Sequence, residues 1–154
     1  MHLPVEKILK TKNISYRLIE LDGISFTVGD VLRLSKGKLQ GDEVCKTIII
    51  KGRKTGTFYG ILLRGEDKLD FKKIKKLLGE EHTVATADEV KEVAGVCPGA
   101  VCPFLLSCHL FVEERVVALS RFNCGSGHHL YGLECKVEDI EKGVSYTVIS
   151  TRKE

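Results

Sequence analysis

Lys46 is the residue whose type and position in the sequence could do chemistry most directly. It lies within the β-branched, apolar run 44–51, which is typical of a strand. Side chains alternate along a strand, so Lys46 shares one face with Val44, Ile48 and Ile50. An ammonium on an apolar face is costly unless an anion or a wet cleft receives it. Lys46 is therefore a candidate anion-binding residue, although its long stem could also carry the charge outward to water.

Two glycine-rich segments could bring the backbone close to a ligand. Residues 95–104 hold two glycines and two prolines, and residues 123–129 place Ser126 between Gly125 and Gly127. Glycine permits close approach, proline holds the path rigid, and successive free N–H groups can bind a carbonyl oxygen or a carboxylate. The second segment has no Walker-type lysine and is not a nucleophile elbow. A plain turn is the alternative for both segments.

A third group of residues that could do chemistry consists of cysteines and histidines. Zinc would accept four such thiolates and imidazoles, but the sequence has no CxxC pair, so we expect neither a metal nor another cofactor. Small apolar packing is the alternative for most of the cysteines. The residues concerned are Cys45, Cys97, Cys102, Cys108, Cys124, Cys135, His109, His128 and His129.

Length and composition limit the kinds of protein in which these candidate residues could act. With 154 residues, the chain is expected to form one domain over residues 1–154. The net charge of +3, from 24 basic and 21 acidic residues, permits an RNA ligand but is too mild to indicate a nucleic-acid coat. The sequence shows no signal peptide and no membrane-spanning run, so we expect a cytoplasmic protein with reduced thiols and neither a membrane nor a DNA partner.

Capping residues and apolar spacing predict short helices around these candidates. Pro4 suits a first helical turn, Thr27 and Asp70 are N-caps, and Thr86 opens a capping box with Glu89. Residues 123–127 are predicted to form a tight turn, and a last short helix is predicted at 137–142. Strands are predicted at 14–18, 44–51, 57–63, 108–113, 115–122, 129–134 and 145–149.

The order of these elements indicates the fold class. Strands arrive as hairpins interrupted by single short helices. This order favours an α/β (mixed α+β) fold. We expect a mostly antiparallel mixed sheet that is partly barrel-like and surrounded by short helices.

Four segments, taken in their order along the chain, carry a resemblance to a known family. They are Phe-Thr-Val-Gly-Asp at 26–30, Cys-Lys-Thr-Ile-Ile-Ile at 45–50, Gly-Ala-Val-Cys-Pro-Phe at 99–104, and the glycine turn, strand and helix over 125–140. Together they resemble the helix-opening threonine segment, lysine–threonine strand, GxxxP loop and C-terminal region of the YbaK family. This family of aminoacyl-tRNA editing domains is related to the insertion domain of bacterial prolyl-tRNA synthetases. The resemblance spans about residues 14–149.

The resemblance implies an enzyme, an aminoacyl-tRNA deacylase that hydrolyses the ester joining a wrong amino acid to the 3′ adenosine of a tRNA. Lys46 would hold the acceptor-end phosphate or ribose, and the loop at Gly99 would fix the aminoacyl group. Such a site needs no side-chain nucleophile, because positioning and oxyanion stabilisation act on an ester that is already activated. The implied substrate-binding residues are Thr27, Ala100, Val101, Cys102, Pro103, Gly125, Ser126 and Gly127.

The resemblance leaves the substrate open within a class. It implies a small amino acid such as alanine, cysteine or serine, on tRNA-Pro or a related tRNA. The implied partner is the acceptor end of that tRNA, and an aminoacyl-tRNA synthetase is a further candidate. Some members carry serine or threonine at the position of Cys102, and a histidine of the alanine-editing branch is not assigned to His128 or His129. The alternatives are a non-catalytic tRNA- or nucleotide-binding module of the same fold, and a small zinc or redox protein.

Overall fold

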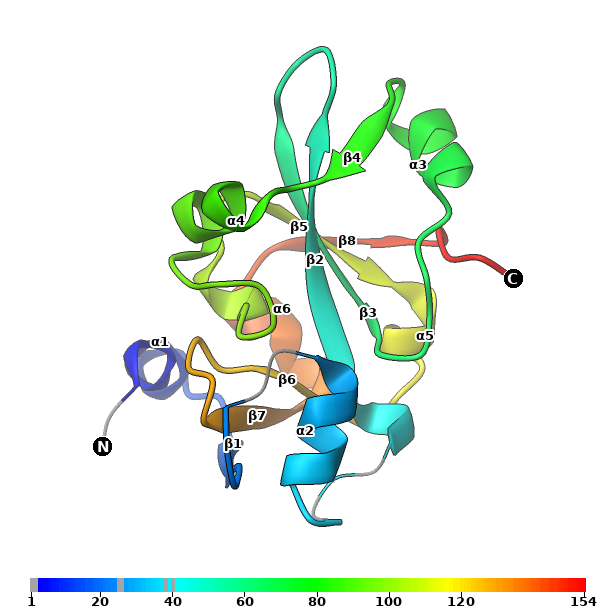
Figure 1. Cartoon of the computed structure of the whole chain (residues 1–154). Helices are drawn as coiled ribbons and strands as arrows, with labels where there is room; N and C mark the ends of the chain where they lie inside the picture. Colours follow the sequence, from blue (N-terminus) through cyan, green and yellow to red (C-terminus); the bar gives the residue numbers. More distant parts are fainter. Residues whose placement is uncertain (1–2, 25–26, 38, 40) are drawn as a thin grey trace.

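The computed structural model describes residues 3–24, 27–37, 39 and 41–154, and its strands form two sheets (Figure 1). The larger sheet has the order β4 (His82–Val84), β2 (Cys45–Gly52), β3 (Phe58–Arg64), β5 (His109–Glu113) and β8 (Tyr146–Ile149). The smaller sheet has the order β1 (Tyr16–Glu20), β7 (Tyr131–Lys136) and β6 (Arg121–Gly125).

Pairing is antiparallel in both sheets except between β3 and β5 and between β5 and β8. The predicted mixed, mostly antiparallel α/β architecture is confirmed. The strand pairings of the described residues do not close either sheet into a barrel, so the expectation of a partly barrel-like sheet was wrong.

The helices begin where the sequence places their caps. The hydroxyl of Thr27 accepts a hydrogen bond from the Asp30 amide at 3.0 Å, and Asp70 and Thr86 cap the next two helices. The predicted segment 26–30 begins at Phe26, which lies outside the described residues. The helices are α1 (Pro4–Thr11), α2 (Val28–Leu34), α3 (Phe71–Leu78), α4 (Ala87–Ala94), α5 (Glu114–Val117) and α6 (Ile140–Gly143). Short 3₁₀ turns occur at Gly41–Glu43, Pro103–Leu105 and Val137–Asp139.

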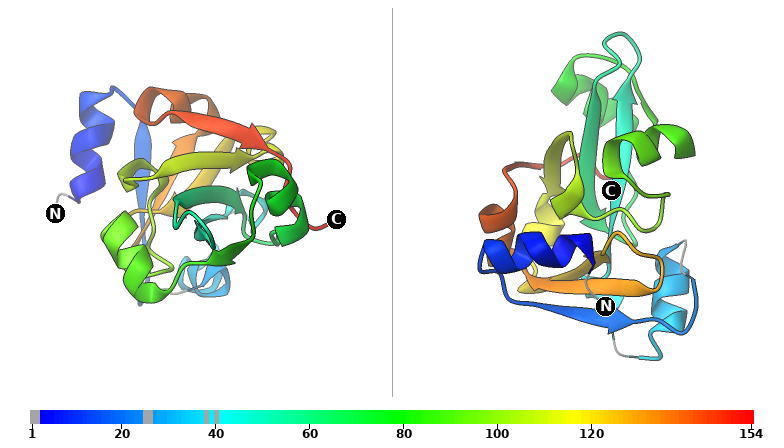
Figure 2. Two further views of the ribbon diagram at one scale, coloured as in Figure 1. Left: turned by 90° about the horizontal axis from the view of Figure 1, so that it is seen from above. Right: turned by 90° about the vertical axis from the view of Figure 1, so that its left-hand side faces the viewer.

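The two sheets meet where β2 and β6 come together. Val44, just before β2, forms an isolated parallel bridge with Asn123 of β6. Figure 2 shows α1 lying across the smaller sheet, and Leu9 of α1 is buried in the same apolar cluster as Leu133 of β7 and Leu62 of β3. This cluster fixes the smaller sheet against the larger one. Among the described residues, no helix is long and apolar enough to span a membrane.

One predicted strand was wrong. Residues 115–122 form helix α5 and only the beginning of β6, because the chain must turn here from the larger sheet to the smaller one. A helical turn makes this reversal while it still buries Val116. Strand β6 then continues to Gly125, so the turn predicted at 123–127 begins only at Ser126. The three-residue strand β4 was not predicted.

Candidate functional site

A cavity of about 460 Å³ lies between α2, α4 and strand β2, with the ends of β6 and β7 forming part of its wall. This volume is typical of small-molecule sites. Lys46 is the only charged side chain among the described residues that line it. The lining consists of Thr27, Val28, Gly29, Val31, Leu39, Val44, Cys45, Lys46, Thr47, Ile48, Ile49, Gly65, Val84, Ala85, Val90, Pro98, Gly99, Val101, Asn123, Cys124, Gly125, Tyr131 and Gly132.

The half-buried Lys46 ammonium reaches the carbonyl oxygen of Gly65, at an Nζ–O distance of 3.1 Å. Burial lowers the pKa of Lys46 from its ordinary value of 10.5, and the nearby Asp67 opposes this shift. An ammonium has three donors, so two remain for a ligand. The arrangement favours an anion beside Lys46, because an anion would restore the interactions that burial removes.

Gly65 is a site residue that sequence reasoning missed. A Cβ at this position would lie 2.6 Å from a methyl carbon of Val28 and 3.0 Å from the carbonyl oxygen of Val44. Only glycine therefore lets α2 pack over the end of β3 while the Gly65 carbonyl faces Lys46. The only signal in the sequence is a glycine directly after a predicted strand, which also fits an ordinary turn.

The two glycine-rich segments predicted as candidates lie against each other. The Gly127 amide donates to the Ala100 carbonyl oxygen at 2.9 Å. A Cβ on Gly125 would overlap the carbonyl oxygen of Val101. In Figure 1 the loop after α4 lies over the turn between β6 and β7. Residue 125 must therefore be glycine for the loop to pack closely on β6.

Gly99 lies at the exposed rim of the cavity with φ +95°, a backbone conformation that favours glycine. Val101, two residues on, is buried and lines the cavity. Between them, the Ala100 amide donates to the Cys97 carbonyl oxygen at 3.3 Å. Among the described residues, neither the Gly99 amide nor the Val101 amide donates to a backbone carbonyl oxygen. The loop can therefore present N–H groups to a carbonyl oxygen.

Five predicted site residues lie behind the cavity lining. Ala100, Cys102 and Pro103 are buried, with Cys102 in the main apolar cluster. The Ser126 hydroxyl has the carbonyl oxygens of His128 and Tyr131 within reach, at 3.1 and 2.7 Å, and its single proton can be donated to either, so it holds the turn together. Gly127 has φ +88° in the same turn. Thr27, by contrast, lines the cavity while its hydroxyl caps α2.

Two buried polar side chains of the lining have no protein partner. The Oγ1 atom of Thr47 and both side-chain polar atoms of Asn123 are buried without a hydrogen bond. Sequence reasoning included Thr47 only in the strand that resembles the YbaK family, and it placed Asn123 in a turn. Buried polar atoms are nearly always hydrogen-bonded in proteins, so these three atoms are exceptions within the wall of the cavity.

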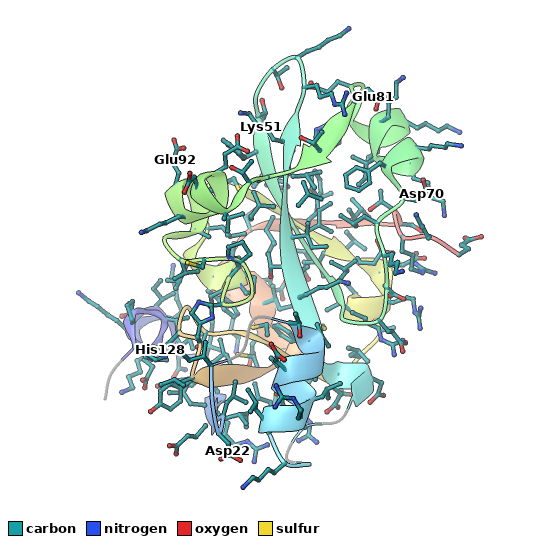
Figure 3. All side chains as sticks on the ribbon, in the orientation of Figure 1. Asp22, Lys51, Asp70, Glu81, Glu92 and His128 are labelled. Carbon is teal, nitrogen blue, oxygen red and sulfur yellow. The ribbon has the colours of Figure 1, made fainter. Side chains whose placement is uncertain are left out.

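Four of the six cysteines are buried free thiols. Among the described residues, no group of three or more Cys, His, Asp or Glu side chains could hold a metal ion. Burial raises the pKa of Cys45 and of Cys135 to about 12, and it raises the pKa of Cys124 well above its ordinary value. These thiols therefore remain protonated at neutral pH, whereas a cysteine nucleophile must be a thiolate. His128, labelled in Figure 3, accepts from the Leu130 amide at 3.1 Å within the β6–β7 turn.

A family model described as an aminoacyl-tRNA editing domain matches residues 28–142. This range contains Lys46, the loop at Gly99 and the contact between that loop and β6. All the elements that line the cavity lie within it, apart from the capping residue Thr27.

Solved structures with the same fold cover nearly the whole chain. The structure of hypothetical protein APE2540 superposes with a TM-score of 0.86 over 97% of this chain and 99% of that chain, at 24% identity. A proposed trans-editing enzyme for prolyl tRNA synthetase superposes with a TM-score of 0.84 over 100% of both chains, at 19% identity. In a proposed signal transduction protein from Marinobacter aquaeolei VT8, the match has a TM-score of 0.74 and 16% identity, and covers 99% of this chain but 31% of that chain. At these identities the similarity shows a shared fold.

Proposed function

Because the chain belongs to the aminoacyl-tRNA editing domain family, we propose that it is a trans-editing hydrolase. Its substrate would be a tRNA that carries a wrong, small amino acid such as alanine, cysteine or serine, on tRNA-Pro or a related tRNA. The observation that carries the proposal is the Lys46 ammonium within an otherwise uncharged cavity, beside a loop that presents backbone N–H groups.

Lys46 supplies the contact with the tRNA backbone. A phosphate or ribose oxygen at the acceptor end would accept from the two ammonium donors that Gly65 leaves unused. The charge is held at a fixed point of β2, so this contact would place the 3′ end relative to the loop. Lys46 therefore binds and orients the substrate.

The loop supplies the contact with the ester. The amides of Gly99 and Val101 would donate to the ester carbonyl oxygen and to the oxyanion that develops from it. A water molecule, oriented by the neighbouring ribose hydroxyl, attacks the carbonyl carbon; the bond to the 3′ oxygen breaks, and that oxygen takes up the proton that the water loses, which releases the free amino acid. Correct positioning of such reactants alone can supply about 7–11 kcal/mol of the barrier reduction.

The commonest general bases of hydrolases are missing from the described lining. It contains no carboxylate and no histidine among the described residues, and burial keeps the Cys45 and Cys124 thiols protonated. This composition fits catalysis by positioning. It also supports a second candidate function, a tRNA-binding module without turnover.

A panel of mischarged tRNAs separates the two functions. Purified protein is incubated with tRNA-Pro and related tRNAs charged with alanine, cysteine, serine or proline, and the loss of ester is followed over time. We expect repeated turnover of at least one small amino acid and protection of the correct pairing. Binding to tRNA with no ester loss above the spontaneous rate would establish the binding module instead.

A further inference from the structure

Strand β2 is paired along the whole of one edge but only at the two ends of the other. β3 pairs with it over residues 45–51. On the opposite edge, β4 pairs with residues 50–52, and the bridge to Asn123 covers Val44 (Figure 1). Among the described residues, no strand covers the stretch between these two contacts. This open edge of β2, residues 46–48, is partly exposed between buried neighbours on both sides, and it lines the cavity.

The alternation of backbone groups along β2 decides which of them point to the open edge. The Ile49 carbonyl oxygen accepts from the Ala85 amide at 2.9 Å, so odd-numbered residues face the β4 side. The Val44 carbonyl oxygen accepts from the Gly65 amide at 2.8 Å, so even-numbered residues face β3. The N–H and C=O groups of Thr47 therefore both point to the open edge. Neither has a backbone partner in the part of the chain that the structure describes.

The free backbone of the open edge is one residue long, which limits what can pair with it. The Ile49 carbonyl is already used at one end and the Val44 bridge lies at the other, so a peptide strand has no further groups to pair with. One amino acid does fit, because opposite residues of an antiparallel pair exchange both of their N–H···O bonds. The α-amino nitrogen and carbonyl oxygen of an aminoacyl ester have the same spacing as the backbone nitrogen and oxygen of one strand residue.

We propose, on the basis of the proposed function, that the Thr47 backbone binds the aminoacyl group as a one-residue strand. The Thr47 carbonyl oxygen accepts from the α-amino group, and the Thr47 amide donates to the ester carbonyl oxygen. That oxygen has two lone pairs, so an amide of the loop at Gly99 can donate to it as well. Backbone groups recognise the part that all aminoacyl esters share, and the α-amino group is thereby part of what the site requires.

This pairing also fixes the direction of the substrate. A partner antiparallel to β2 runs from the β4 end toward Val44, so the ester oxygen and the tRNA leave at the Val44 end. The Lys46 ammonium lies at that end, since it reaches the carbonyl of Gly65, whose amide is bonded to Val44. The α-amino group points the other way, toward Ala85. A group attached to the amino nitrogen would therefore meet β4.

The first test changes the substrate and leaves the protein intact. Single-turnover rates are measured for the best aminoacyl ester of the panel, its deaminated analogue and its N-acetylated form on the same tRNA, each divided by its spontaneous rate of hydrolysis. We expect the acceleration to fall at least ~100-fold for both modified esters, because the carbonyl carbon is no longer held in position. Binding of the uncharged tRNA serves as the reference for the intact contact at Lys46.

The second test removes the Thr47 amide. Proline is tolerated at a strand edge where the N–H is not part of the ladder, so Thr47→Pro should fold. Ile48→Pro loses an amide that faces β3 and should melt at a lower temperature than Thr47→Pro. Thr47→Val is the matched variant, because it loses the hydroxyl and keeps the amide. Deacylation by Thr47→Pro should be at least ~100-fold slower than by Thr47→Val, while both bind uncharged tRNA equally.

Three results would overturn the assignment and leave the proposed function in place. They are an undiminished acceleration of the deaminated ester, an undiminished acceleration of the N-acetylated ester, and equal deacylation by folded Thr47→Pro and Thr47→Val. If Thr47→Pro does not fold, the comparison of esters decides by itself. Wild-type protein that is inert on every ester removes the proposed function and this inference together.

Discussion

At the scale of single residues, the fold holds the Lys46 charge in a place where it is costly. Its ammonium has one carbonyl partner, Gly65, and burial lowers its pKa because the charged form loses hydration. Asp67 limits this shift through its negative charge. A bound phosphate would reverse this shift, because a negative charge beside the ammonium favours its charged form and raises the pKa again.

The lowered pKa predicts how tRNA binding depends on pH. Below the lowered value Lys46 is charged and binds phosphate. As the pH rises through that value, the free protein loses the proton and affinity for uncharged tRNA falls, at a pH below the ordinary 10.5. Lys46→Arg should keep its affinity to higher pH, because arginine is not deprotonated in this range. Binding curves at constant ionic strength measure this, and identical pH profiles for the two proteins would show that Lys46 makes no such contact.

The same lowered pKa determines whether the contribution of Lys46 to the free energy of unfolding rises or falls with pH. Between the lowered pKa of folded Lys46 and its value in the unfolded chain, the unfolded state binds more protons than the folded state. The contribution of Lys46 to the free energy of unfolding therefore rises with pH across that window.

At the scale of helices, strands and loops, the site depends on contacts between segments that are ordinary connections when each is taken alone. The loop at Gly99 is an ordinary helix-to-strand connection until Gly125 and Gly127 come against its backbone. Local signals predict such segments well when the cause is local: Thr27, Asp70 and Thr86 cap helices through neighbouring residues. They do not set the bounds of β6, because the chain's turn from the larger sheet to the smaller one depends on long-range packing, for example on the bridge from Asn123 to Val44.

The backbone at Gly99 gives a prediction with a matched control. Gly99 and Gly79 both have positive φ, of +95° and +83°, but only Gly99 lies at the cavity. Alanine at either position should lower the free energy of unfolding by about 1 kcal/mol through backbone strain. Only Gly99→Ala should also lower single-turnover deacylation, by roughly tenfold or more, because the loop amides move. Equal activity in both variants at a temperature where both are folded would mean that the loop is only a connector.

At the scale of the whole molecule, the cavity exists only because two sheets meet. Its lining draws on residues from Thr27 to Gly132, so nearly the whole fold is needed to assemble it. The sequence indicated Lys46 by its face on a strand, and it indicated the loop and the glycine turn by their glycines and prolines as well as by the resemblance. It did not show that Ser126 holds the turn together or that Asn123 is buried, because burial and hydrogen-bond partners are set by packing between sheets. Gly65 was missed for the same reason, since the helix that packs on it comes from another part of the chain.

The most direct test of the account compares Lys46→Met with Lys51→Met in single-turnover deacylation of the best substrate in the panel. Both variants change the same strand and lower the net charge of +3 by one, so their fold and overall electrostatics are matched. The Lys51 ammonium is bound by Glu89 at 2.6 Å, and Lys51 is not part of the cavity lining. We predict a loss of at least ~100-fold for Lys46→Met, equivalent to about 2.7 kcal/mol of transition-state stabilisation, and less than about twofold for Lys51→Met. Near-normal deacylation by folded Lys46→Met, or equal losses in the two variants, would contradict the assignment of this cavity as the site of ester hydrolysis.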